Sequence, residues 1–236
     1  MRIRPCQRCP KWRGGWCSVY ARRMVAAAPS CPPGRRMMDR EYMRIYMQKH
    51  KKPGRLEENK EDQMRIKEIC EKAGVEFSRL EALGFMRAPC SKGHHLNRAG
   101  GLAEHSKNVV EWILKLSPAF GATWDDPRSP YVVGLLHDFV KLYNYDFDGE
   151  GRIKYRQAPV FGHGAASAIL VQAELGIALT RQEALAITWH MGAFNLAGDD
   201  LKAYDVALDM EPRAILVTHT ADMMAARVTE CDRRPA

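Results

Sequence analysis

The chain lacks any run of apolar residues as long as the roughly 20 that a bilayer-spanning helix needs. We therefore expect no membrane span and no membrane partner. No apolar stretch follows the basic residues near the amino terminus, so we also expect no signal peptide and a cytoplasmic location. The sequence shows no internal repeat, which argues against a solenoid or another repeat fold.

Cysteine is scarce: the 236 residues include only seven, which is an odd number. This excludes a disulfide framework as the basis of the fold. We expect reduced thiols or metal ligands instead. Two residues separate Cys6 from Cys9, a spacing at which two thiolates grip one tetrahedral ion, and Cys17 and Cys31 can complete a four-thiolate site. A structural zinc ion would let this short segment fold with little core. An iron–sulfur cluster and unliganded thiols are the alternatives.

Acidic residues are scarce in the first quarter of the chain. Residues 1–60 hold 16 Lys and Arg against 4 Asp and Glu, a formal charge of +12. Residues 61–236 hold 20 against 24, a formal charge of −4. The asymmetry indicates two functional parts and favours a polyanionic partner, such as nucleic acid, for the first.

A proline–glycine pair at 53–54 separates these parts. We predict a basic Cys-rich module over 1–54 and a larger domain over 55–236. Inside the module, 37–50 has the pattern of an amphipathic helix with basic residues around its apolar face. Docking onto the larger domain and nucleic-acid binding are the two interpretations of that helix.

The larger domain has the apolar spacing of a mostly helical structure. The predicted helices cover 57–73, 76–84, 102–117, 130–143, 163–175, 180–191 and 210–229. A D-G-E-G turn within 144–159, flanked by alternating residues, predicts a small β-hairpin. Apolar residues make up 46% of the chain, which suffices for a core. We therefore expect an all-α bundle with a β-hairpin insertion.

Histidine is distributed in an informative way, since seven of the eight lie between positions 94 and 219. Together with two aspartates they form an ordered series: His105, His137-Asp138, His163, His190 and Asp222. The gaps of 26 to 32 residues leave room for one helix and its connection each. Imidazoles and carboxylates supplied by separate helices are the ligands of a buried divalent-metal site.

The pair His137-Asp138 lies inside an apolar run. A carboxylate is costly to bury as an isolated ion. A bound metal ion explains the placement, because its charge compensates the carboxylate and makes neutral imidazole a favourable neighbour. A buried histidine–aspartate hydrogen bond is the alternative.

Five short motifs occur in a recognisable order. They are His94-His95 before Gly100-Gly101-Leu102-Ala103-Glu104-His105, then Leu136-His137-Asp138, Gly162-His163-Gly164, Trp189-His190-Met191 and His219-Thr220-Ala221-Asp222. Across roughly 90–230 the chain thereby resembles the HD-domain metal-dependent phosphohydrolase superfamily, and most closely the HD domain of bacterial 3′-to-5′ exoribonucleases. The resemblance implies an HD-type helical bundle.

The resemblance also implies a pair of metal ions. The first would be held by His105, His137, Asp138 and Asp222. The second would be held by His163 and His190, with Asp138 bridging, and the ions would be manganese, iron, magnesium, cobalt or nickel. Judged from the residues alone, His163 could instead cap a helix, and His190 could be a satisfied core histidine.

Further residues would act around such ions. Lys141 follows the His–Asp pair by one helical turn and can reach a phosphate bound to the metals, unless it is a solvated surface lysine. His94 and His95 would protonate a leaving group or bind phosphate, or else have a structural role. Glu104 and His219 are candidates for orienting a ligand.

The resemblance implies a phosphodiesterase, nuclease or nucleotidase that acts on a phosphorylated small molecule or a nucleic acid. Phe139-Val140 forms a bulkier wall than the family usually has. Met191 stands where the cyclic-dinucleotide enzymes of the superfamily carry a second histidine, which disfavours that substrate. A di-iron oxygenase acting on a polyol or phosphonate uses the same ligands and is the alternative. A non-catalytic binding protein is a third hypothesis.

Overall fold

The computed structural model describes residues 60–92, 96–148, 151–160, 162–194 and 196–231, all within one compact unit. The predicted thiolate site at Cys6, Cys9, Cys17 and Cys31, the predicted helix 37–50 and the two histidines His94 and His95 lie outside the described residues.

Helices dominate the described residues, which confirms the predicted all-α class. The helices are α3 (Lys60–Ala73), α4 (Phe77–Ala82), α5 (Gly101–Leu116), α6 (Ser129–Leu136), α7 (Lys141–Asn144), α8 (His163–Leu170), α9 (Arg181–Trp189), α10 (Asp199–Met210) and α11 (Pro212–Met224). Short π-helical turns, Val171–Leu175 and Ala225–Thr229, extend α8 and α11.

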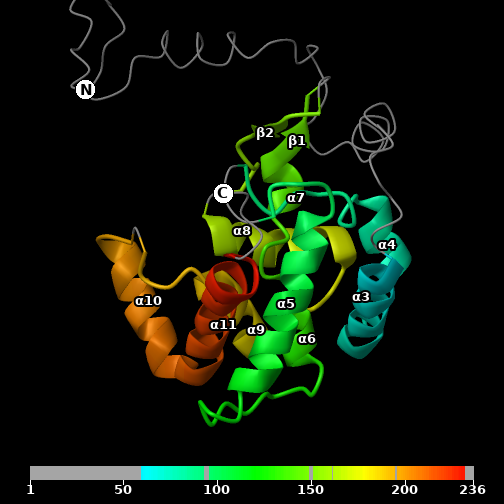
Figure 1. The fold of residues 1–236 in the computed structure, drawn as a ribbon. Coiled ribbons are helices and arrows are strands. Elements are labelled where there is room, and N and C mark those ends of the chain that lie inside the picture. Colours follow the sequence, from blue (N-terminus) through cyan, green and yellow to red (C-terminus); the bar gives the residue numbers. More distant parts are fainter. Residues whose placement is uncertain (1–59, 93–95, 149–150, 161, 195, 232–236) are drawn as a thin grey trace, which may run out of the picture. The chain divides into compact units, whose positions relative to one another are not determined.

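The predicted hairpin is also present. Strand β1 (Tyr145–Phe147) pairs antiparallel with β2 (Ile153–Tyr155), and Tyr145 faces Tyr155 in the register. It projects from the end of α7, away from the helices (Figure 1). Among the described residues, no helix combines the length and the apolarity required to cross a bilayer.

Helix α5 holds a central position and packs against α3, α6 and α11, while α9 packs against α6, α8 and α11. Figure 1 shows α3 on one side of α5 and α6, with α10 and α11 on the other. A Cβ added at Gly134 of α6 would lie 2.9 Å from the backbone nitrogen of Val110 on α5. The absence of a side chain at Gly134 therefore lets these two helices approach closely.

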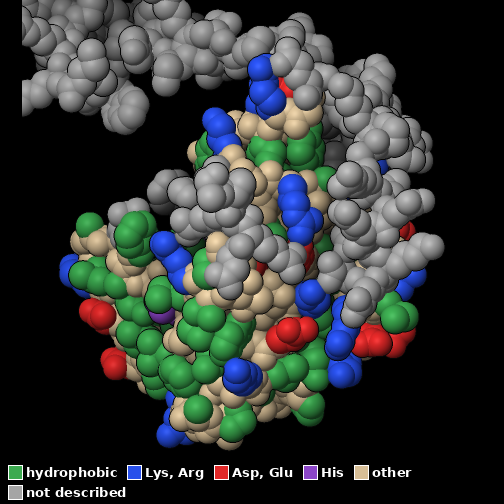
Figure 2. Space-filling model, in the orientation of Figure 1, with side chains coloured by type: hydrophobic (Ala, Val, Ile, Leu, Met, Phe, Trp, Pro, Cys, Tyr) green, Lys and Arg blue, Asp and Glu red, His purple; other side chains and the backbone are tan. Residues whose placement is uncertain are grey.

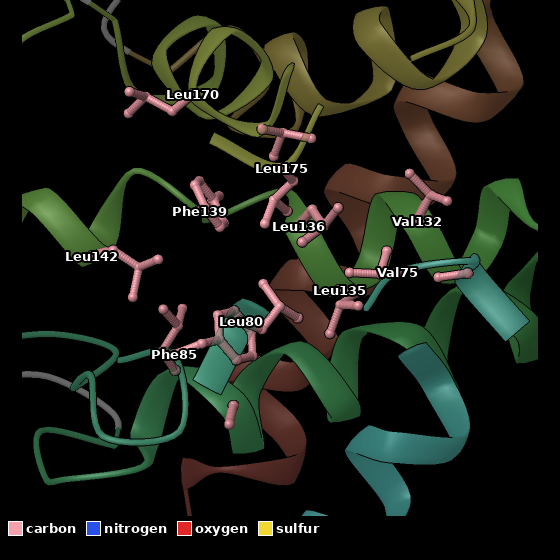
Figure 3. Close-up of a cluster of buried hydrophobic side chains, with 14 of the residues drawn as sticks. Val75, Leu80, Phe85, Val132, Leu135, Leu136, Phe139, Leu142, Leu170 and Leu175 are labelled. Carbon is pink, nitrogen blue, oxygen red and sulfur yellow. The ribbon is translucent and has the colours of Figure 1, made fainter. Parts of the chain in front are cut away.

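A large apolar cluster fills the space between α3, α6 and α8. Leu135, Leu136 and Phe139 are fully buried in it. Leu170 and Leu175 contact them from one side, and Leu80 and Phe85 lie on the other (Figure 3). Burying a side chain of this size stabilises the fold by about 1.5–3 kcal/mol. The segment that carries the His–Asp pair is thus fixed by the core itself.

The predicted helix 130–143 is interrupted. Its α-helical part ends at Leu136, residues 137–140 form turns, and α7 starts at Lys141. In this interruption the backbone hydrogen bonds join residues three apart instead of the four of an α-helix. The Phe139 N–H donates to the Leu136 carbonyl, and the Lys141 N–H donates to the Asp138 carbonyl. The apolar composition predicts one continuous helix because no proline or glycine marks the break.

Helix α10 was not predicted. Its sequence mixes acidic and apolar residues, and its buried residues are Tyr204 and Ala207. Hydrophobic side chains on α10 and α11, among them Val206, Met210 and Leu216, remain exposed. Figure 2 shows hydrophobic side chains gathered over this part of the surface. The apolar residues of α10 therefore divide between two faces, which weakens the helical pattern.

Gly164, next to His163, permits a close contact between α8 and α9. A Cβ at this position would lie 2.1 Å from the Thr188 carbonyl oxygen and 2.5 Å from that of Ile187. Gly164→Ala is expected to lower the free energy of unfolding by about 1–3 kcal/mol or more, because neither backbone can yield easily. Urea unfolding measures the change, with Ala165→Ser as the control one residue along α8. Equal stability of Gly164→Ala and the parent chain would contradict this contact.

Candidate metal centre

Five helices or their ends deliver the predicted ligands to one place. His105 lies in the first turns of α5, His163 begins α8, and Asp222 lies on α11. His137 and His190 directly follow the last residues of α6 and α9. The side chains of His105, His137 and His190 are completely buried. Thr180 and Glu183 form a reciprocal capping box that fixes the start of α9.

Asp138 occupies the middle of this cluster. Its Oδ2 lies 3.5 Å from His105 Nε2 and 3.4 Å from His137 Nε2, and its Oδ1 lies 3.6 Å from His190 Nε2. His163 Nε2, from the start of α8, comes within 2.5 Å of Oδ1. The two carboxylate oxygens thus face different sets of imidazoles, as a bridging ligand does.

Asp222 completes one side of the cluster. Its Oδ1 lies 3.0 Å from His105 Nε2. The six residues of the predicted series therefore converge, although they are spread over half of the sequence.

The two histidines that end helices have the same orientation. Nδ1 of His137 donates to the Gly134 carbonyl at 3.0 Å, and Nδ1 of His190 donates to the Ile187 carbonyl at 2.7 Å. Carbonyls in the last turn of a helix need such donors. The opposite nitrogens point into the cluster. In the described part of the chain, both Nε2 atoms are buried without a hydrogen-bond partner. Leaving a buried nitrogen in that state is costly, and an imidazole held through Nδ1 offers its Nε2 to a metal.

His105 is held by a carboxylate that the sequence did not point to. Its Nδ1 lies 3.0 Å from Oε1 of Glu230, which also accepts a hydrogen bond from Asn108 Nδ2 at 2.9 Å. Glu230 follows the π-helical turn after α11 and is almost fully buried. A carboxylate behind a histidine fixes the tautomer and raises the basicity of the nitrogen that faces the metal.

Glu230→Gln is expected to weaken metal affinity by about 10- to 100-fold, because the amide keeps the shape but not the charge behind His105. Titration of the metal-free chain with zinc or manganese measures the affinity. Glu68→Gln, on the exposed face of α3, is the control. Unchanged affinity in Glu230→Gln would show that this carboxylate has no part in metal binding.

The charges of the cluster favour ionised carboxylates. Burial alone would raise the pKa of the Asp138 carboxyl, but Lys141 and His137 lower it well below its ordinary value. For Asp222, burial has the same opposing effect, and the hydrogen bond with His105 brings its pKa below the ordinary value. Burial lowers the pKa of His137, which favours the neutral imidazole that coordinates a metal ion.

Lys141 points into the same cluster. Its Nζ lies 2.5 Å from Asp138 Oδ2 and donates to Cys90 Sγ at 3.3 Å. Only 12% of its side chain is exposed, so it is not a solvated surface lysine. Burial would lower its pKa, but Asp138 raises the pKa above the ordinary value and keeps the ammonium charged. Lys141 follows Asp138 by three residues, and in the turn after α6 its backbone N–H also donates to the Asp138 carbonyl at 2.9 Å.

The remaining candidates take other positions. Glu104 forms an ion pair with Arg98 on the preceding loop. His219 Nδ1 donates to the His190 carbonyl at 2.7 Å, so it supports the segment that carries a predicted ligand. His163 differs from the other histidines of the cluster because 29% of its side chain is exposed.

The donor atoms are close enough to share metal ions. Within the described residues, three overlapping groups have donors that all lie within 4.8 Å of one another: His105, His137 and Asp222; His137, Asp138 and His190; Cys90, His105 and Asp138. Metal–ligand bonds of about 2.0–2.3 Å require such separations. The buried cluster therefore fits a metal ion. Cys90 is not among the ligands predicted from the sequence, because no second cysteine is paired with it at a ligand spacing.

Comparisons with known proteins return no match: no protein-family model, no curated protein and no solved structure is similar to this chain.

Proposed function

We propose that this chain is a metal-dependent phosphohydrolase of the HD type, which cleaves a phosphoester of a nucleotide or a nucleic acid. One observation carries the proposal. Buried imidazole Nε2 atoms and two carboxylates surround a common point, and a buried lysine ammonium contacts the central carboxylate. Carboxylate and imidazole ligands can bind metal ions, and a cationic side chain can bind a phosphate, so together they can bind and cleave a phosphoester.

Asp138 would bridge two divalent ions. His105, His137 and Asp222 would hold one ion, and His163 and His190 the other. Manganese, iron, cobalt and nickel suit a set of imidazoles and carboxylates better than magnesium, which prefers oxygen ligands. Such ions, when bound, lower the pKa of a water molecule and polarise phosphoryl oxygens.

The protein's own side chains would place the substrate. The Lys141 ammonium contacts the Asp138 carboxylate, which the proposed histidine ligands also surround. From this position it can bind a non-bridging phosphate oxygen. His163 and Asp222 are partly exposed, with 29% and 20% of their side chains accessible, whereas His105, His137 and His190 are completely buried. Substrate would therefore reach the ions from the side of His163 and Asp222.

Residues 1–54 would recruit a polyanionic substrate through their excess of basic residues. Binding of single-stranded and duplex oligonucleotides to the full chain should then weaken steeply as salt concentration rises. Binding that is independent of salt, or no binding at all, would remove nucleic acid from the proposal and leave a small phosphorylated substrate.

The deciding experiment is a hydrolysis assay. The full chain is stripped of metal, reloaded in turn with manganese, iron, cobalt, nickel or magnesium, and offered model phosphodiesters, nucleotides and short oligonucleotides. We expect hydrolysis in the reloaded samples and none in the stripped one. Consumption of oxygen with a polyol or phosphonate by the iron-loaded chain, without hydrolysis of any phosphoester, would instead establish the di-iron oxygenase. Inactivity in both assays with full metal occupancy would rule out a catalytic centre of either kind.

A further inference from the structure

Cys90 lies beside the metal centre and is completely buried. Its sulfur accepts a hydrogen bond from Lys141 Nζ at 3.3 Å. It also belongs, with His105 and Asp138, to a group of donor atoms that all lie within 4.8 Å of one another. The sulfur thus faces the same carboxylate as the histidines.

The fold fixes the position of this sulfur. The Cys90 N–H donates to the Leu96 carbonyl at 3.2 Å, and the Leu102 N–H donates to the Ala88 carbonyl at 3.0 Å. A Cβ at Gly101 would lie 2.1 Å from the Leu96 oxygen and 3.0 Å from the Cys90 nitrogen. The glycine at the start of α5 therefore lets the loop with Cys90 lie directly against the helix that carries His105.

The other described cysteines have different surroundings. Cys70 is buried in the apolar cluster on α3, where burial and then Glu71 raise the pKa of its thiol to about 12. Cys231 is partly exposed and donates to the Val228 carbonyl. Among these three, Cys90 alone belongs to a group of potential metal donors.

We infer that Cys90 is a thiolate ligand of the metal centre, where its sulfur joins His105 and Asp138 on one ion. The inference rests on the metal centre of the proposed function and adds to it the kind of ion bound. Thiolate ligands select zinc, iron or cobalt and are poor partners for magnesium and calcium. The centre therefore binds a borderline-soft ion in preference to magnesium.

Charge and protons balance in this arrangement. When an ion binds at His105 and Asp138, the S–H bond of Cys90 breaks, a metal–sulfur bond forms, and the proton leaves to solvent. Lys141, which already contacts the sulfur, remains as a hydrogen-bond donor to the thiolate.

Cobalt(II) provides a test that does not depend on turnover, since a thiolate bound to cobalt gives a charge-transfer absorption in the near ultraviolet. The full chain is loaded with cobalt as wild type, Cys90→Ser and Cys70→Ser. The amino-terminal cysteines contribute equally to all three spectra. We expect the Cys90→Ser difference spectrum to show loss of one thiolate contribution and the Cys70→Ser difference spectrum to show none. If both difference spectra are flat while cobalt stays bound, Cys90 is not a ligand.

A folding defect in Cys90→Ser does not remove the test. Cys90→Ala, which buries no hydroxyl, carries the same expectation. The wild-type chain loaded with ¹¹³Cd gives a further reading, because its resonance position depends on the number of sulfur ligands. A signal between those of four-thiolate and of purely nitrogen–oxygen coordination supports the inference, and its absence overturns it.

The cobalt spectra and the hydrolysis assay test the sulfur ligand and the proposed function independently. A chain that hydrolyses no phosphoester but loses its cobalt–thiolate absorption in Cys90→Ser would retain the sulfur ligand and lose the proposed activity. A chain that hydrolyses phosphoesters, with unchanged absorption in Cys90→Ser, would show the reverse.

Discussion

Asp138→Asn is expected to abolish metal binding at the histidine–aspartate cluster and to lower phosphoester hydrolysis by on the order of a thousandfold or more. The carboxylate lies within 3.6 Å of four imidazole nitrogens and contacts the Lys141 ammonium. An asparagine amide keeps the size of this side chain but supplies a neutral oxygen and an NH₂ donor. Neither can bridge two cations. Elemental analysis after gel filtration measures metal content, and the hydrolysis assay measures the rate.

Asp199→Asn is the matched control for this substitution. Asp199 pairs with Lys202 at 3.0 Å and with the same sequence separation as Asp138 and Lys141, but on the surface of α10. Its replacement should leave both metal content and rate unchanged, because exposed ion pairs contribute little. An Asp138→Asn chain that kept its full metal content would contradict the bridging role.

The convergence of these histidines and aspartates could be predicted because members of the series carry local signals. His137-Asp138 is an expensive pair in an apolar run, and the spacing to His163 and His190 fits one helix each. Such residues are costly to bury singly, so their occurrence on apolar helices indicates a shared ligand. The structure brings these side chains together, while their role in catalysis stays a prediction.

Glu230 and Cys90 carried no such signal. Glu230 reaches His105 across 125 residues of sequence and follows a π-helical turn, a form that side-chain periodicity does not reveal. Cys90 has no partner cysteine at a ligand spacing and reaches the cluster through the close approach at Gly101. Their positions depend on tertiary packing, which the sequence pattern alone does not specify.

The same limit explains the errors in the secondary structure. The helix over 130–143 ends early because the chain turns at His137–Val140 inside the core, without a proline or glycine to mark the turn. The hairpin was predicted because its turn residues are local. Local chemistry therefore predicted most of the helices, the hairpin and the residues of the cluster. Packing determined where the helices end and which residues support the cluster.

Lys141→Met is expected to lower hydrolysis by about 100- to 1,000-fold while the metal ions stay bound. The ammonium contacts the central carboxylate but is not itself a metal ligand. Removing it takes a positive charge away from the place where cations bind, so the affinity for metal should stay the same or increase. Loss of rate without loss of metal separates a substrate-binding lysine from a structural one. The measurement pairs elemental analysis with kcat and KM for a model phosphodiester.

Lys202→Met on α10 is the control, because it removes the surface lysine of the comparable pair with Asp199. Lys141→Arg adds a second reading. It keeps the charge but not the compact ammonium, so partial recovery of rate relative to Lys141→Met would assign the effect to charge at the phosphate. If Lys141→Met loses its metal ions together with its activity, Lys141 holds the cluster in shape and does not bind the substrate. That result would remove the phosphate-binding role of Lys141 from the proposed function.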